Sequence, residues 1–135
     1  MKDPSNELKA AFYTALNGNT TLPVYTMVPD GVDDFIVIGD CTLTGDVAKD
    51  RYITDNTLQV EIVKTYRNQG SKKAVDTDSN AIVGIIRNAF ASTVTLTSFV
   101  VSLVVIDGMN DFVEDTEEFK IYRKIIRFRL IIEEK

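Results

Sequence analysis

Apolar residues recur at helical spacing in two stretches of the chain, which predicts two amphipathic helices. The first helix follows Asp3, a candidate N-cap, and Pro4 at the first helical position, and it stops at Gly18. Its apolar stripe comprises Leu8, Ala11, Phe12, Ala15 and Leu16. The second helix follows Gly70, with Ser71 as its candidate N-cap. Its stripe comprises Val75, Ile82, Ile85, Ile86, Ala89 and Phe90. We expect Phe12, Leu16, Ile82, Ile86 and Phe90 to face the core.

Runs rich in β-branched and aromatic residues predict the strands. Residues 35–43 and 56–67 form two such runs between the helices, and we expect them to pair antiparallel. The polar stretch 44–55 between them predicts a long loop that is mobile in the free protein and ordered by a neighbouring subunit. A third strand is expected over 94–106, followed by an acidic connector over 107–118.

The chain closes with "IYRKIIRFRLII", residues 121–132, and a short extended piece is expected around residues 24–27. The order is therefore helix, short strand, two strands, helix, two strands. This order predicts one α+β domain over residues 1–135. It would consist of a mainly antiparallel sheet of four to five strands with two amphipathic helices packed on one face.

The closing strand has two different faces. One face is apolar and comprises Tyr122, Ile126, Phe128, Leu130 and Ile132. The other carries Arg123, Arg127 and Arg129 among Ile121, Ile125 and Ile131. Two main interpretations stay open for this second face, and a nucleic acid site is a third, which is disfavoured because no surface aromatics are interleaved with the arginines. The face is a solvated outer face paired with acidic side chains of neighbouring strands, or it is a subunit interface, where arginine is enriched and the isoleucines are buried between copies.

The interface interpretation names specific partners, because a buried guanidinium group needs a counter-charge. It places Arg123, Arg127 and Arg129 at or beside a contact between subunits. The opposing carboxylates would come from the acidic connector: Glu114, Asp115, Glu117 or Glu118.

Composition argues against several kinds of chemistry. The chain contains no histidine and one cysteine, so the commonest general base and any zinc site built from several thiolates are missing. An EF-hand loop starting at Asp107 fails because Met109 and Phe112 occupy its third and sixth positions. We therefore expect no enzyme, no cofactor and no metal, with a weak cation site on the connector as the alternative.

Charge and hydropathy limit the partners. The net charge of −5 has the wrong sign for a protein that grips a nucleic acid backbone. No apolar run approaches the ~20 residues of a membrane span, and the first ten residues lack the pattern of a secretory signal. We expect neither a membrane association nor sequence-specific binding of nucleic acid, and we expect synthesis in a cytoplasm.

Taken in order, these elements resemble the tail-completion or tail-terminator proteins of long-tailed bacteriophages and their prophage relatives. The resemblance is carried by the helix end "ALNGNTTL", the segments "VYTMVPDGVDDFIVIGD" and "LQVEIVKTYRNQGSKKA", the helix "AIVGIIRNAF" and the long final strand. It spans nearly the whole chain.

The resemblance implies a non-enzymatic subunit of the virion tail or neck, assembled in the host cytoplasm. Such subunits commonly form hexameric rings that cap the tail tube and present a surface to the head connector. A lumen lined by acidic side chains would let DNA pass without adhering. The alternatives are another neck or head-completion protein, a monomeric α+β binding module, and an enzyme that uses only carboxylates and serine.

Overall fold

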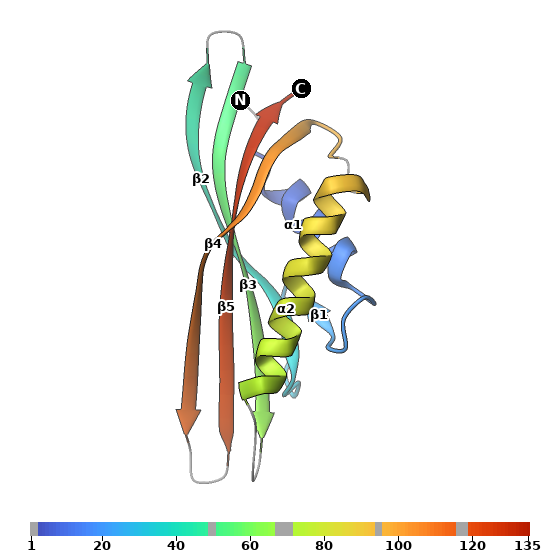
Figure 1. Ribbon diagram of the computed structural model, residues 1–135, viewed down its shortest axis with the longest axis vertical. Helices are drawn as coiled ribbons and strands as arrows, with labels where there is room; N and C mark the ends of the chain where they lie inside the picture. Colours follow the sequence, from blue (N-terminus) through green and yellow to red (C-terminus); the bar gives the residue numbers. More distant parts are fainter. Residues whose placement is uncertain (1–2, 49–50, 67–71, 94–95, 116–118) are drawn as a thin grey trace.

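The elements of the fold occur in the predicted order. The computed structural model describes residues 3–48, 51–66, 72–93, 96–115 and 119–135. Figure 1 shows the elements along the chain. They are α1 (Ser5–Leu16), β1 (Val24–Tyr25), β2 (Phe35–Ala48), β3 (Arg51–Tyr66), α2 (Lys72–Asn88), the π-helical turn η1 (Ala89–Thr93), β4 (Phe99–Asp115) and β5 (Lys120–Glu134).

The strands form one sheet in the order β1-β2-β3-β5-β4. The pairs β2–β3, β3–β5 and β4–β5 are antiparallel, as expected. The short β1 pairs parallel with β2, so the sheet is mixed, and the expectation of a mainly antiparallel sheet needs this correction. The parallel pair arises because residues 26–34 carry the chain back to start β2 beside β1, where the Ile36 amide donates to the Pro23 carbonyl. The α+β class holds.

Both helices pack on the same side of the sheet and share one core with it (Figure 1). Leu8, Phe12 and Leu16 of α1 are fully buried, and the ring of Phe12 lies 5.3 Å from that of Phe128 on β5. From α2, the buried side chains are Val75, Ser79, Ile82 and Ile86. Phe90 lies in η1 and is only partly buried, so its placement in the core was overstated, and Ser71 lies outside the described residues.

The ends of α1 follow the sequence signals with a small shift. The helix begins at Ser5, so Asp3 is not its N-cap residue, although the Asp3 carboxylate accepts hydrogen bonds from the Ser5 amide at 2.9 Å and from the Ser5 hydroxyl. Pro4 therefore occupies the cap position and not the first helical position. Gly18 follows the helix with a φ of +80°, a left-handed conformation that favours glycine, and so ends it.

The ends of the sheet differ most from expectation. The predicted mobile loop 44–55 is wrong, because β2 and β3 continue as a paired hairpin from Thr44 and Asp55 to Ala48 and Arg51. The predicted connector 107–118 is also wrong, because β4 runs to Asp115 alongside β5. Polar residues adopt these conformations because the neighbouring strand supplies the partners for their backbone groups.

Two ion pairs hold α2 on the sheet where the apolar core ends. Lys64 of β3 lies 2.8 Å from Asp78, and Lys124 of β5 lies 2.7 Å from Asp76. Burial lowers the pKa of Lys64, but its hydrogen bond to Asp78 and the nearby negative charge outweigh this effect and raise it. These lysines lie on the helix-facing side of the sheet, so the two ion pairs add to the burial of Val75 in holding the first half of α2, while apolar packing holds the second half.

Candidate assembly surface

The sheet surface turned away from the helices, called the outer face, carries the three arginines of β5. Ile126, Phe128, Leu130 and Ile132 are fully buried towards the helices, so the alternate residues point outwards. The predicted separation of the two faces of the closing strand is therefore confirmed. β5 lies between β3 and the edge strand β4, which places the arginines on the outer face one strand in from this edge.

Arg123 and Arg129 are paired within their own chain. Arg123 donates from Nη1 to Oε1 of Glu61 on β3 at 3.1 Å, and its Nε lies 3.3 Å from Oε1 of Glu114 on β4. Arg129 donates hydrogen bonds from both Nε and Nη2 to the carboxylate of Asp55 on β3, and the shortest of them is 2.7 Å. For these two arginines, the structure supports pairing with the acidic side chains of neighbouring strands.

The Asp55–Arg129 pair shifts the titration of both groups. Hydrogen bonds from Arg129 lower the pKa of Asp55, and Asp55 in turn raises the pKa of Arg129. The side chains remain 36% and 45% exposed, so water screens the interaction. The pair is therefore expected to fix the conformation of Arg129 more than to stabilise the fold.

The exchange Asp55→Asn is expected to lower the free energy of unfolding by less than ~1 kcal/mol at neutral pH. Because the pKa of Asp55 is lower in the folded state, its contribution is present above the unfolded pKa and is lost as the pH falls through the folded pKa. Urea unfolding of both proteins across the acidic range should show the difference shrinking as the pH falls. A much larger loss, or a loss that does not depend on pH, would contradict an exposed pair.

Arg127 differs from the other two arginines. Its neighbours in register are Gln59 on β3 and Gly108 on β4, and neither carries a charge. Within the described part of the chain, Arg127 makes no ion pair at 4 Å or less. Because Gly108 has no side chain, one flank of this arginine is open.

The predicted acidic partners are dispersed. Glu114 lies on the outer face and faces Arg123 of the same chain, where the hypothesis expected a neighbouring copy. Asp115 ends β4 and is exposed, in register with Lys120. Glu117 and Glu118 lie outside the described residues.

An apolar edge is the feature that the sequence analysis missed. In the described part of the chain, seven of the ten exposed large hydrophobic residues lie on β4, the edge strand: Val100, Leu103, Val105, Ile106, Met109, Phe112 and Val113. Single exposed hydrophobic residues are ordinary, but a contiguous set on a strand edge marks an interaction surface or an aggregation hazard.

Register divides these residues between the two faces of the sheet. Val100, Leu103, Val105 and Phe112 pair with outward residues of β5 and lie on the outer face. The half-buried Ile121, Ile125 and Ile131 of β5 lie beside them. We call these four residues of β4 and three isoleucines of β5 together the edge patch. The sequence signal for this patch was the run "FVVSLVVI", in which the residues directed to both faces of the strand are apolar.

The candidate cation site on residues 107–118 lies partly outside the described residues. Across the described ranges, no three cysteine or acidic side chains lie close enough together to hold a metal ion. None of the helices in those ranges is long and apolar enough to cross a membrane.

Fold and surface together define an α+β protein whose helices cover one side of a mixed sheet and whose other side presents arginines and an apolar edge patch. No protein-family model and no curated protein sequence matches the chain.

Among solved structures, the chain matches one described as "Virion of native gene transfer agent (GTA) particle". The TM-score is 0.72 at 14% sequence identity, and the match covers 98% of this chain and 99% of the other. The two proteins therefore share a fold from end to end.

Proposed function

We propose that the chain is a structural, non-enzymatic subunit of a virion. The observation that carries the proposal is the end-to-end likeness in fold to a chain of the gene transfer agent virion. The edge patch and the open flank of Arg127 supply what such a subunit needs, a surface for neighbouring proteins.

Within the virion we assign the chain to the end of a tail. There it would form a ring, hexameric as in the tail-terminator family that its sequence resembles, cap the tail tube and meet the head connector. The net charge of −5 suits a ring through which DNA passes. Another neck or head-completion protein would share the virion and the ring but would not bind tube ends.

The test is sedimentation and electron microscopy of the purified chain with and without tail tubes. Rings bound to one end of the tubes are the expected result. Binding to head connectors but not to tubes would indicate that the chain is a head-completion protein and not a tail terminator. A chain that stays monomeric with and without tubes would overturn the proposal and leave a monomeric binding module or an enzyme.

Within that ring, inter-subunit ion pairing is assigned to Arg127, because Arg123 and Arg129 are already paired within the chain. Those two arginines would lie beside the contact. Asp115 of a neighbouring copy is the remaining described candidate for the opposing carboxylate, since Glu114 is engaged by Arg123.

Reversal of charge by Arg127→Glu is expected to weaken self-association about tenfold or more, because it would place like charges at the contact. Sedimentation equilibrium measures this effect, and thermal melting should show an unchanged fold. Lys9→Glu is the matched control, with the same change of charge on α1, away from the outer face that carries Arg127. If Arg127→Glu assembles and caps tubes like the parent, this arginine belongs to a solvated face.

A further inference from the structure

A shallow groove lies between the end of α2, with η1, and the edge strand β4. It contains two hollows of about 190 and 170 Å³, which share Arg87 and Val104 in their linings. The other lining residues are Phe90, Ala91, Val101, Ser102, Leu103, Val105, Ile106 and Phe128. Since one water occupies ~30 Å³, each hollow has room for a side chain.

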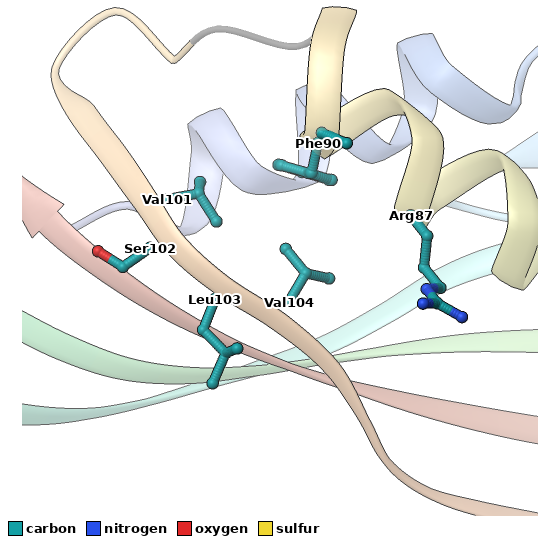
Figure 2. Close-up of a pocket in the computed structure, with 7 residues that line it drawn as sticks. Arg87, Phe90, Val101, Ser102, Leu103 and Val104 are labelled. Carbon is teal, nitrogen blue, oxygen red and sulfur yellow. The ribbon is translucent and has the colours of Figure 1, made fainter.

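The groove is apolar at its floor and positive at its rim. Figure 2 shows Val101 and Val104 of β4 pointing towards Phe90 of η1, with Arg87 extending from α2 beside them. Arg87 is exposed, and no described carboxylate pairs with it. The π-helical turn that places Phe90 here is a local departure from α-helix of a kind often found at functional sites. The groove therefore suits an apolar side chain that is followed by a negative charge.

A segment with this chemistry lies at the opposite edge of the sheet. The loop 26–34 between β1 and β2 exposes 85% of Met27, and its charged residues, Asp30, Asp33 and Asp34, are all acidic. Asp34 accepts a hydrogen bond from the Thr65 amide at 2.9 Å, and the Asp33 carbonyl accepts one from the Thr65 hydroxyl at 3.2 Å. These bonds tie the base of the loop to β3, so less conformational freedom is lost on docking.

We propose that loop 26–34 of one copy docks into the α2–β4 groove of the next copy, with Met27 in a hollow and Asp30 facing Arg87. Methionine adapts to irregular apolar gaps, and the acidic loop complements the arginine at the rim. β1 and β4 are the two outermost strands of the sheet, so the contact is head to tail. Repetition of a head-to-tail contact generates a ring when the rotation closes.

This inference rests on the proposed assembly with copies of the same chain. A segment of another protein with an apolar tip and an acidic flank would also fit the groove. The second copy is favoured because the chain itself carries that segment, exposed and fixed at its base, on the edge that faces away from its own groove.

Cross-linking between two separately tagged variants tests the contact. Met27→Cys and Ser102→Cys are made in a Cys41→Ala background, and the mixture is treated with a short bismaleimide, alone and with tail tubes. Ser102 is exposed, lines the groove and is nearly isosteric with cysteine, so the fold should tolerate the exchange. A mixed dimer is expected. Tyr13→Cys, exposed on α1, replaces Met27→Cys in the matched control and should give none.

A charge exchange tests the predicted pair. Arg87→Asp and Asp30→Arg should each weaken self-association about tenfold or more, and the double variant should recover most of the loss. A double variant that loses as much as both single variants together would overturn the pairing.

The outcomes separate this contact from the proposed function. Oligomers that form without a cross-link between positions 27 and 102 would overturn the contact while the ring stands. A cross-link from the groove to the tube protein in place of a second copy would also overturn it. A chain that remains monomeric with and without tubes would overturn the contact and the proposed function together.

Discussion

The exchange Phe12→Ala is expected to lower the free energy of unfolding by ~3–5 kcal/mol, because it removes a fully buried ring from the middle of the core. Phe12 of α1 contacts the rings of Phe90 in η1 and Phe128 in β5, with centroids 5.4 and 5.3 Å away. One residue therefore joins both helical segments to the sheet. Denaturant unfolding followed by circular dichroism measures the loss.

The neighbouring position on the same helix supplies the control. Tyr13 is 37% exposed, so Tyr13→Ala should change the free energy of unfolding by less than ~1 kcal/mol. If Phe12→Ala were as mild as this control, α1 would not pack on the sheet as the structure shows.

The double exchange Leu103→Lys with Val105→Lys is expected to abolish ring assembly while leaving the fold intact. Both side chains lie on the outer face of the edge strand, 45% and 37% exposed, so the folded chain can keep the charges in water. An uncompensated charge buried in a subunit contact costs ~3–5 kcal/mol. This corresponds to about two to four powers of ten in affinity. Sedimentation equilibrium alongside thermal melting measures both effects.

Tyr13→Lys tests whether the position of the new charge matters. It places a lysine on another exposed apolar side chain, on α1 and away from the edge patch, and should assemble like the parent. Normal rings from the Leu103→Lys, Val105→Lys variant would show that the edge patch is not a subunit contact.

Periodicity predicted the parts of the fold in which local pattern and packing agree. Leu8, Phe12 and Leu16 recur every four residues and share one face of α1, and all three are buried. Strict alternation from Ile126 to Ile132 likewise separated the two faces of β5. In both segments one uninterrupted period fixes the buried side, so the sequence alone sufficed.

Periodicity failed where the ladder is irregular. β4 contains register shifts at Val101–Leu103 and Ile106–Gly108, and each extra residue exchanges the face on which the following side chains lie. No single period describes such a strand, so its second half was assigned to a connector. The tip of the β2–β3 hairpin was missed because its polar residues are held by backbone pairing with the adjacent strand.

The sequence placed the arginines of β5 on one face of the strand but did not give their pairing. Alternation placed Arg123, Arg127 and Arg129 on one face. Their partners Asp55 and Glu61 are far away in sequence and become neighbours only because β5 lies beside β3. Strand order is a tertiary property. The structure was therefore needed to distinguish Arg123 and Arg129, which form ion pairs within the chain, from Arg127, which has an open flank.

The two register shifts in β4 have a consequence for the size of the assembly. A long, regular apolar edge invites another strand to add by backbone hydrogen bonding, and nothing in that pairing limits how many chains follow. Ser102 and Asp107 each interrupt the regular spacing of amide and carbonyl groups along the edge. A continuous ladder of backbone hydrogen bonds to a second chain is therefore disfavoured along β4. Copies are left to contact one another through side chains, which fix the angle between them. The two register shifts that obscured the alternation of β4 in the sequence therefore also disfavour growth into a fibre.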